Sequence, residues 1–325
     1  MAKRIEFAET GGPEVLRMQE FEPEALGPRD VRVTNWAIGL NFIDIYVRTG
    51  LYPVSELPSG LGTEGAGVIE AVGEEVKEFR EGDRVAYATG PLGAYATHYT
   101  LPADKVVMLP DSIGFDQAAA AMLKGLTVQY LLRQVYPIKS GDTFLFHAAA
   151  GGVGLIACQW ARSLGARLIG TVSTPEKAEF ARKNGAWATI NYSEENVVER
   201  VRELTDGQMC PVVYDSVGRD TWETSLDCLA PRGLMVSFGN ASGPVEGVNL
   251  ATLNKKGSLF VTRPSLAGYA DTRERLEAMS QELFQVIAND SVHVNIGCRF
   301  RLDEAGEAQQ NLASRRTSGS TILIP

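Results

Sequence analysis

The stretch "FHAAAGGVGLIACQWARSLGA", Phe146 to Ala166, decides the fold class. Aligned on the dinucleotide-binding pattern GxGxxG, it offers Ala149, Gly151 and Gly154. In that pattern the first glycine permits a tight turn, the second lets the backbone approach a pyrophosphate, and the third lets helix and strand pack closely. Alanine at the first position reduces the freedom of the turn. Because small residues also occur where a helix simply packs tightly on a sheet, the neighbouring segments must decide between the two interpretations.

Those neighbouring segments alternate between strand-like and helix-like patterns. The apolar "TFLF" comes before the glycines and a helix-like segment follows them. Next come "ARLIGTVS", the helix-like "TPEKAEFARKNG", and the short apolar runs "WATIN", "PVVYDSVG", "GLMVSFGN" and "GSLFVTR". Strands alternating with helices of about 10 to 15 residues indicate right-handed crossovers and a parallel sheet covered on both faces. We therefore expect a doubly wound Rossmann domain, with a phosphate at the positive N-terminus of the helix after the glycines.

The end of the second strand indicates which dinucleotide is bound. NAD-binding folds place an acidic residue there, on the ribose 2′-hydroxyl. This chain has Ser173, Thr174 and Lys177 instead. Hydroxyls and a lysine suit a 2′-phosphate, which accepts several hydrogen bonds and carries negative charge. The sequence therefore predicts NADPH rather than NADH. Alternatively, Ser173 and Thr174 cap the helix that begins near Pro175 and Lys177 is a solvated charge, a role compatible with phosphate binding.

The rest of the chain predicts a second, β-rich domain. Up to about Pro110 the segments are short, β-branched and broken by glycine and proline, which favours a barrel-like domain. A helical pattern covers Phe115 to Val135. After about Arg263 the helices and strands no longer continue the alternation, so we assign them to the β-rich domain. The predicted division is 1–125 with 264–325 for the β-rich domain and 126–263 for the Rossmann domain.

Composition limits the possible partners and location. The 325 residues are 44% hydrophobic and carry a net charge of −9, which disfavours nucleic acid as the main partner. The N-terminus lacks the apolar core of a signal peptide, and no run approaches the roughly 18 apolar residues of a membrane span. We expect a cytoplasmic protein. The four cysteines have no CxxC spacing and are expected to be reduced, mostly buried thiols.

Several segments in order resemble one family. They include "NFIDIYVRTGLY", "GTEGAGVIEAVG", "GDRVAY", "AAAAMLKGLTVQYLL", "HAAAGGVGLIACQWA" and "KGSLFVTRPSL". The chain resembles the zinc-independent quinone oxidoreductases, the zeta-crystallin-like group of the medium-chain dehydrogenase/reductase superfamily, and in particular its bacterial NADPH:quinone reductases. The resemblance implies a GroES-like catalytic domain built from both ends of the chain and a Rossmann domain between them. It also makes Ala149 an expected variation of the fingerprint.

The same resemblance indicates whether the chain has the ligands of a catalytic zinc. Zinc-dependent relatives carry a cysteine ligand where this chain has Asn41 and a histidine where it has Thr63. A catalytic zinc needs three ligands of cysteine, histidine or carboxylate type, and neither residue qualifies. The three histidines, His98, His147 and His293, are scattered without ligand spacing. We therefore expect no metal.

Without zinc the expected reaction is reduction of an electrophilic, conjugated acceptor. A quinone fits, since the charge brought by a hydride spreads over the conjugated system. The resemblance implies Asn41, Tyr46 and Tyr52 on the substrate side, with no residue assigned as an essential acid or base. Asn41 would donate to a carbonyl oxygen, and the tyrosines have half-buried packing as their ordinary alternative. The alternatives are an NADPH-dependent alkenal or enone reductase and, in another class, an NADPH-binding structural or RNA-binding protein.

The resemblance also implies a wider set of cofactor contacts and a homodimer paired through the strand "GSLFVTR". Gly239 has a turn role as its alternative, and the two arginines a surface role. Together with the fingerprint and second-strand residues, the expected cofactor-binding set is Asn41, Phe42, Tyr46, Thr127, Tyr130, Gly151, Gly152, Val153, Gly154, Ser173, Thr174, Lys177, Tyr192, Ser216, Phe238, Gly239, Asn240, Ser242, Arg263 and Arg315.

Overall fold

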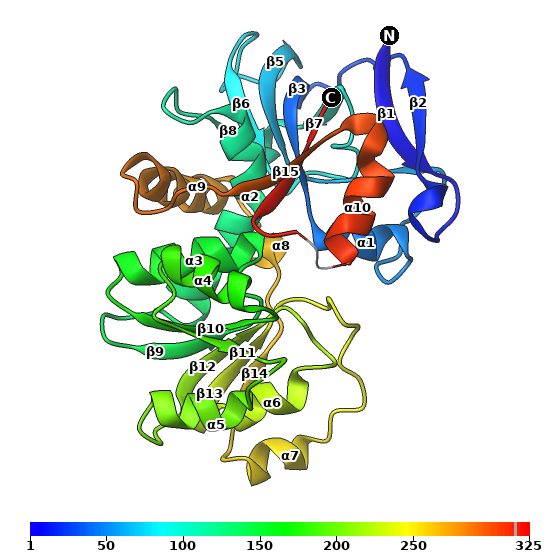
Figure 1. Ribbon diagram of the computed structural model, residues 1–325. Helices are drawn as coiled ribbons and strands as arrows, with labels where there is room; N and C mark the ends of the chain where they lie inside the picture. Colours follow the sequence, from blue (N-terminus) through cyan, green and yellow to red (C-terminus); the bar gives the residue numbers. More distant parts are fainter. Residues whose placement is uncertain (315–316) are drawn as a thin grey trace. The chain divides into compact units, whose positions relative to one another are not determined.

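The computed structural model describes residues 1–314 and 317–325, and the chain divides into two compact units (Figure 1). Unit 1 comprises Met1–Leu126, Ala270–Asp290 and Val294–Pro325. Unit 2 comprises Thr127–Tyr269 and Ser291–His293. Both ends of the chain therefore belong to one unit. The boundary falls within α2 (Phe115–Tyr130), which continues into a π-helical turn, η3 (Leu131–Val135).

The described residues of unit 2 form a six-stranded parallel sheet in the order β11-β10-β9-β12-β13-β14. Its strands are β9 (Thr143–Phe146), β10 (Arg167–Val172), β11 (Ala188–Asn191), β12 (Cys210–Asp215), β13 (Leu229–Ser237) and β14 (Phe260–Thr262). The strand order reverses direction between β9 and β12, as in a doubly wound sheet, where ligands bind beyond the carboxyl ends of the strands. The predicted Rossmann architecture is confirmed.

Helices cover both faces of this sheet. Figure 1 shows α3 (Gly152–Ser163) and α4 (Pro175–Lys183) on one side, and α5 (Val197–Leu204) and α6 (Trp222–Asp227) on the other. The central strands are apolar on both faces because both are covered, and Leu145, Ile169 and Val213 are fully buried. The unit also contains α7 (Leu250–Lys255) and α8 (Leu266–Tyr269).

In the part of unit 1 that the structure describes, a seven-stranded sheet has the path β15-β16-β3-β5-β6-β8, with β7 paired to β3. A second sheet has the order β2-β1-β4. The strands are β1 (Ala2–Phe7), β2 (Arg17–Phe21), β3 (Asp30–Leu40), β4 (Ser59–Gly60), β5 (Gly65–Val72), β6 (Arg84–Tyr87), β7 (His98–Pro102), β8 (Val106–Met108), β15 (Ile296–Arg301) and β16 (Ser320–Ile324). The predicted β-rich partner to the Rossmann sheet is confirmed.

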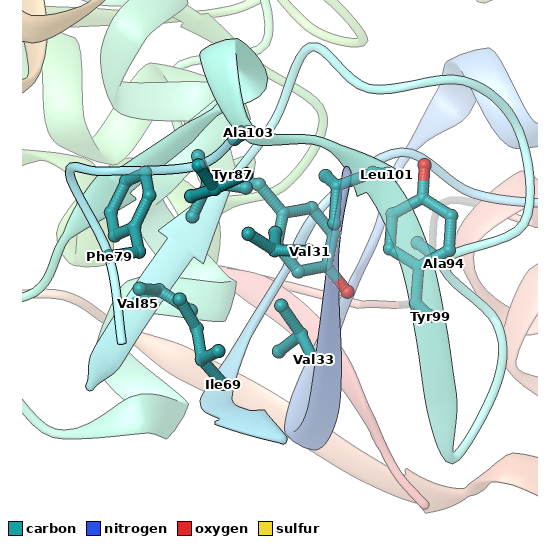
Figure 2. Close-up of a cluster of buried hydrophobic side chains, with 12 residues drawn as sticks. Val31, Val33, Ile69, Phe79, Val85, Tyr87, Ala94, Tyr99, Leu101 and Ala103 are labelled. Carbon is teal, nitrogen blue, oxygen red and sulfur yellow. The ribbon is translucent and has the colours of Figure 1, made fainter. Parts of the chain in front are cut away.

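The long strand β3 organises unit 1. It pairs antiparallel with β5, β7 and β16, so a strand from the C-terminal end of the chain completes the sheet. The register between β3 and β5 shifts twice, and such irregularities bend a strand and increase its twist. The bent sheet encloses a core in which Val33, Val85 and Tyr87 are fully buried (Figure 2).

Unit 1 also contains helices, and one of them was not expected from the sequence. Only short strands were predicted before Pro110, yet α1 (Phe42–Arg48) follows β3 directly. It begins there because Asp44, in the first turn, accepts the backbone N–H of Asn41 at 2.8 Å and stabilises the helix start. The other helical segments of the unit are η1 (Pro13–Val15), η2 (Ala103–Lys105), α9 (Arg273–Ala288), η4 (Leu302–Glu304) and α10 (Ala305–Ala313).

All four cysteines of the chain are described and are free thiols, as the sequence predicts. Cys158, Cys210 and Cys228 are buried, and burial raises the pKa of the first two to about 12. Thiols with such high pKa values are poor nucleophiles at neutral pH. In the described residues, no helix is both long and apolar enough to span a membrane.

Candidate functional site

The fingerprint loop joins β9 to α3. The left-handed backbone conformation falls on Ala148, with φ of 56°, one residue before the position aligned with the first glycine. The turn is closed by the Gly151 N–H, which donates to the Ala148 carbonyl at 3.0 Å. A Cβ on Gly154 would lie 2.4 Å from that same carbonyl oxygen and 2.6 Å from the Cα of Ala149. Only glycine at position 154 therefore lets the helix approach the strand this closely.

The N-terminus of α3 is suited to an anion. Gly151 is its N-cap, and Gly151, Gly152 and Val153 are half-buried. The first N–H groups of a helix have no acceptor within the helix, and the dipole places positive charge there. α3 is 12 residues long and has no acidic residue in its first turn. These features match the phosphate-binding role expected of the loop.

The ends of β10 and β11 bring the residues expected to recognise a 2′-phosphate into one region. The Tyr192 N–H donates to the Val172 carbonyl at 3.1 Å, and the Ser193 hydroxyl donates to the Ser173 carbonyl at 3.1 Å. Ser173 and Lys177 are half-buried, and the side chain of Tyr192 is exposed. The loop after β11 therefore lies directly beside the loop after β10.

Thr174 has a structural task in this loop. It is the N-cap of α4, and its hydroxyl oxygen accepts the Lys177 backbone N–H at 3.3 Å. A side-chain hydrogen bond with Thr174 also helps to lower the pKa of the exposed Glu176, behind the larger contribution of the helix's own N–H groups. The capping alternative is thus realised at Thr174. Ser173 and Lys177 are half-buried in the same loop and the first turn of α4.

The loops after β12 and β13 are bound to one another. Ala241 N–H donates to the Ser216 carbonyl at 3.1 Å. The Ser242 hydroxyl donates to the Val217 carbonyl at 2.9 Å, so it links the loops directly. A Cβ on Gly239 would lie 2.4 Å from the Ser216 carbonyl oxygen, and this close approach, more than a simple turn, requires glycine. The structure thus brings together the expected residues Ser216, Phe238, Gly239, Asn240 and Ser242.

Three more expected cofactor residues lie in unit 2. Arg263 donates to the Gly239 carbonyl at 3.1 Å, which ties it to the loop after β13. Tyr130 is buried and stacks on Tyr269, with ring centroids 4.8 Å apart. Burial raises the pKa of Tyr130, against a hydrogen bond with Thr127 and the charge of Arg263. Tyr130, Thr127 and Arg263 therefore lie close to one another.

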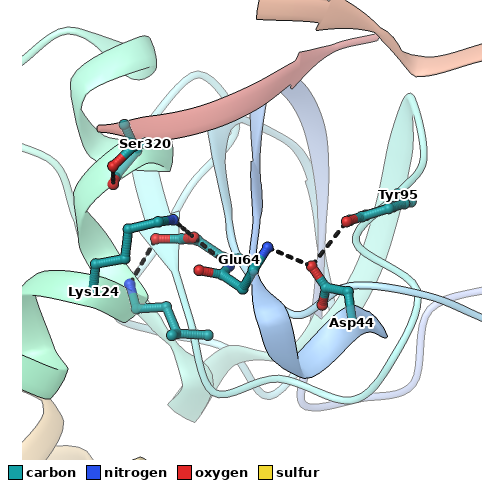
Figure 3. A network of polar contacts seen from close by, with 8 residues as sticks. Asp44, Glu64, Tyr95, Lys124 and Ser320 are labelled. Carbon is teal, nitrogen blue, oxygen red and sulfur yellow. Dashed lines mark hydrogen bonds and ion pairs between the residues drawn. The ribbon is translucent and has the colours of Figure 1, made fainter. Parts of the chain in front are cut away.

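Figure 3 shows a buried polar network of unit 1 that includes Asp44, Glu64 and Lys124. Asn41 belongs to the same network. Its Nδ2 donates to Glu64 Oε2 at 2.7 Å. The Lys124 ammonium lies 3.1 Å from the same oxygen, and the Leu123 N–H donates to Glu64 Oε1 at 2.6 Å. Gly39 on β3 provides the space, since a Cβ there would lie 1.9 Å from Glu64 Oε2. One amide proton of Asn41 is therefore committed to Glu64.

Asp44 forms the other half of this network. Its Oδ2 accepts the Asn41 N–H and the Tyr95 hydroxyl, each at 2.8 Å. Burial is the largest influence and raises the pKa of Asp44 to about 7. The two hydrogen bonds and the charge of Lys124 lower it, and the charge of Glu64 raises it. Two buried carboxyl groups therefore share one lysine.

Aromatic side chains surround the start of α1. The rings of Phe42 and Tyr46 lie 6.2 Å apart, and Tyr46 meets Tyr52 edge to face at 5.4 Å. The Tyr52 N–H donates to the Tyr46 carbonyl at 3.0 Å. All four expected residues of this segment are therefore neighbours, with Asn41 at the N-terminal end. Arg315, also expected at the cofactor, lies outside the described residues.

Sequence reasoning missed some residues that support these sites. It did not assign Lys124, whose signal was a single charge in the apolar helix "AAAAMLKGLTVQYLL". Such a residue is seldom buried unless it is paired. It also missed the buried polar group around His147, Thr171, Asp215 and Ser225, for which the sequence spacing gives no signal.

The chain is similar to known proteins along its whole length. The family described as "Alcohol dehydrogenase GroES-like domain" matches residues 27–111, and the one described as "Zinc-binding dehydrogenase" matches residues 152–285. A quinone oxidoreductase of Pseudomonas aeruginosa is 66% identical over 325 residues, covering 100% of both chains. The crystal structure of Escherichia coli quinone oxidoreductase complexed with NADPH has a TM-score of 0.98 and 59% identity, covering 99% of this chain and 100% of that one. A 2-haloacrylate reductase of Burkholderia is 45% identical over 321 residues, covering 97% of this chain and 96% of its own.

The name of one of these families implies zinc, and the residues do not fit it. Asn41 directs an N–H group toward Glu64, and the Lys124 ammonium lies against the same carboxylate. Within residues 1–314 and 317–325, no three side chains of His, Cys, Asp or Glu type are grouped to hold a metal ion. With relatives of 59% to 66% identity along its whole length, the chain belongs to the zinc-independent quinone oxidoreductases of the medium-chain dehydrogenase/reductase superfamily.

Proposed function

We propose that this protein reduces quinones with NADPH, by hydride transfer and without a metal. The single observation that carries the proposal is the fingerprint loop of unit 2. There Gly154 brings the N-terminus of α3 against the turn at Ala148, and a dinucleotide pyrophosphate fits that geometry. The family supplies the acceptor, because relatives at 66% and 59% identity are quinone oxidoreductases.

Selection of NADPH over NADH is proposed to reside in the loops after β10 and β11. Ser173 and Lys177 would donate to the 2′-phosphate, and the exposed Tyr192 would lie against the adenosine. The hydrogen bond between the Ser193 hydroxyl and the Ser173 carbonyl holds the two loops in register. Thr174 supports this site by shaping the turn before α4, as the N-cap of that helix.

The remaining contacts are proposed from position in each unit. Residues 126–263 would act as the dinucleotide-binding domain, and 1–125 with 264–325 as the catalytic domain. The proposed cofactor contacts in the dinucleotide-binding domain, beyond those above, are Thr127, Tyr130, Gly151, Gly152, Val153, Ser216, Phe238, Gly239, Asn240, Ser242 and Arg263. In the catalytic domain they are Asn41, Phe42, Tyr46 and Arg315.

On the substrate side we propose Asn41, Tyr46 and Tyr52. When bound, NADPH supplies a hydride to the quinone ring. A primary amide has two N–H donors, and Glu64 uses one from Asn41, so the second can donate to a quinone oxygen. That hydrogen bond would stabilise the negative charge developing on the oxygen. The edge-to-face pair of Tyr46 and Tyr52 offers an aromatic wall for a flat acceptor.

A second candidate activity is reduction of an activated alkene. The observation that favours it is the relative from Burkholderia, a 2-haloacrylate reductase at 45% identity. An enone or haloacrylate presents a conjugated carbonyl group, which the Asn41 amide would bind in the way proposed for a quinone oxygen. RNA as the main partner is disfavoured by the net charge of −9.

We propose a homodimer in the cytoplasm. Among the described residues, β14 pairs with β13 and with no other strand, so it forms an edge of the sheet. Phe260 and Val261 on this strand are 62% and 40% exposed. An exposed apolar edge strand is suited to pairing with a second copy about a two-fold axis, which would continue the sheet. Sedimentation of the wild-type protein and of a Phe260→Lys variant tests this, since a lysine on an exposed edge strand opposes pairing with a second copy.

The activity is tested by steady-state oxidation of NADPH and NADH with benzoquinones, naphthoquinones, enones and a 2-haloacrylate. We expect quinone turnover with NADPH to exceed turnover with every alkene. Asn41→Ala and Tyr46→Phe should lower quinone turnover, and Asn196→Ala, which removes an amide from the cap of α5, is the control. If both site variants keep full turnover and full NADPH affinity, the assignment of the substrate side is wrong.

A further inference from the structure

Buried polar side chains connect the carboxyl ends of the central strands in unit 2. His147 follows β9, Thr171 lies in β10, Asp215 ends β12, and Ser225 comes from α6. All four side chains are buried. The two ring nitrogens of His147 contact Thr171 Oγ1 at 3.0 Å and Ser225 Oγ at 2.9 Å, and the Ser225 hydroxyl lies 2.6 Å from Asp215 Oδ2. The result is one continuous chain of hydrogen bonds beneath the fingerprint loop.

The carboxylate of Asp215 sets the direction of these bonds. It accepts from the hydroxyls of Ser225 and Thr221 at 2.6 Å each, and from two backbone N–H groups. Since Ser225 donates to Asp215, its oxygen is the acceptor for a proton on Nε2 of His147. Nδ1 of His147 is then unprotonated and accepts from Thr171. The hydrogen-bond network thus selects the neutral Nε2–H tautomer.

Each end of this series of hydrogen bonds binds the backbone of a loop. At one end Thr171 Oγ1 accepts the N–H of Ala148, the residue in the left-handed conformation, at 3.3 Å. At the other end Asp215 Oδ1 accepts the N–H groups of Val217 and Gly218 at 2.7 and 3.0 Å. The loop at Val217 is in turn bound to Ser242. Two loops proposed to contact NADPH are therefore joined through a single imidazole ring.

We propose that His147 is a positioning residue for NADPH, which as the Nε2–H tautomer fixes the fingerprint turn at Ala148 relative to the loop at Val217 and Gly218. The inference rests on the NADPH site proposed above. The neutral form of His147 agrees with the burial of its ring. Burial lowers the pKa of His147, and the charge of Asp215 acts in the opposite direction. Held in this way, both loops are already arranged before the cofactor binds, which reduces the cost of binding.

The first test measures the Kd of NADPH by its fluorescence, without a quinone. Ser225→Ala breaks the link between His147 and Asp215 and leaves Thr221 and the two N–H groups on the carboxylate. We expect the Kd to rise about tenfold and the loss of turnover to be recovered by raising the NADPH concentration. Ser280→Ala, which removes another buried hydroxyl but in unit 1, is the matched control and should leave the Kd unchanged.

An unchanged Kd in Ser225→Ala overturns the inference, and so does an equal rise in Ser280→Ala. If the wild-type protein itself does not bind NADPH, the proposed function fails rather than this inference. The second test does not depend on any variant folding. The chain has three histidines, so long-range ¹H–¹⁵N spectra of the wild-type protein can resolve each ring. His147 should show a protonated Nε2 and a bare Nδ1, and a protonated Nδ1 would overturn the inference.

Discussion

A methyl group on Gly170 would occupy the space of the methyl group of Ala149. The Cβ that an alanine would place at position 170 lies 2.4 Å from the Cβ of Ala149, far inside van der Waals contact. Gly170 belongs to β10, beside β9, and its neighbour Thr171 accepts the Ala149 N–H at 3.0 Å through its carbonyl. The alanine that replaces the first fingerprint glycine is therefore accommodated by a glycine on the adjacent strand.

Gly170→Ala should destabilise unit 2 and weaken NADPH binding, because two methyl groups cannot occupy one space. Overpacking of this kind costs about 1 to 3 kcal/mol. The double variant Gly170→Ala with Ala149→Gly should recover most of the loss. Urea unfolding followed by circular dichroism measures the first effect, and NADPH fluorescence the second. A double variant no more stable than Gly170→Ala would contradict the pairing.

Removing the charge of Lys124 should leave Glu64 buried without a counter-charge. We expect Lys124→Met to lower the free energy of unfolding by about 3 to 5 kcal/mol, as is typical when one partner of a buried ion pair is removed. Adding Glu64→Gln should restore part of it, since the buried charge is removed and the single amide oxygen can still accept from either Asn41 or the Leu123 N–H. The measurement is a double-mutant cycle in urea. Additive losses in the double variant would show that the two side chains act independently.

Asp44 should make the stability of unit 1 depend on pH. Its pKa in the folded protein, about 7, is above the ordinary value of 3.8, so the folded state binds the proton more tightly. The stabilisation this gives is complete below pH 3.8 and is lost as the pH rises through about 7. Relative to Asp44→Asn, the wild-type free energy of unfolding should fall by about 2 to 3 kcal/mol between pH 5 and pH 8. A difference that is flat over this range would mean that Asp44 titrates near its ordinary value.

Lys177→Ala should reduce the preference for NADPH over NADH. A hydrogen bond to a charged group contributes about 1.5 to 3 kcal/mol, so we expect a loss of at least about tenfold in kcat/KM for NADPH, with little change for NADH. Lys183→Ala on the same helix is the matched control, because its ammonium pairs with Glu179 at 2.6 Å on the surface. If the preference for NADPH stays the same in Lys177→Ala, the 2′-phosphate is recognised elsewhere.

Local patterns in the sequence were enough to predict the fold. The alternation of strands and helices after Thr143 predicts a parallel sheet because each crossover in such a sheet needs a helix. The short, turn-rich segments before Pro110 predict the β-rich unit for an equally local reason. The helix α1 was missed because its start depends on one hydrogen bond from Asn41 to Asp44, within a segment too short for a periodic signal.

The residues of the candidate site also fall into two groups: those that local sequence predicts and those that depend on distant contacts. The fingerprint glycines, Ser173 and Lys177 are adjacent in sequence to the turns they form, so the sequence by itself was enough to propose them as cofactor contacts. Other features of the two units depend on contacts between positions that are distant in the sequence. Gly170 makes room for Ala149, Lys124 neutralises Glu64 under Asn41, and Asp215 fixes the proton on His147 through Ser225. Only the tertiary structure decided these, because packing space and buried hydrogen bonds depend on which strands become neighbours and not on spacing along the chain.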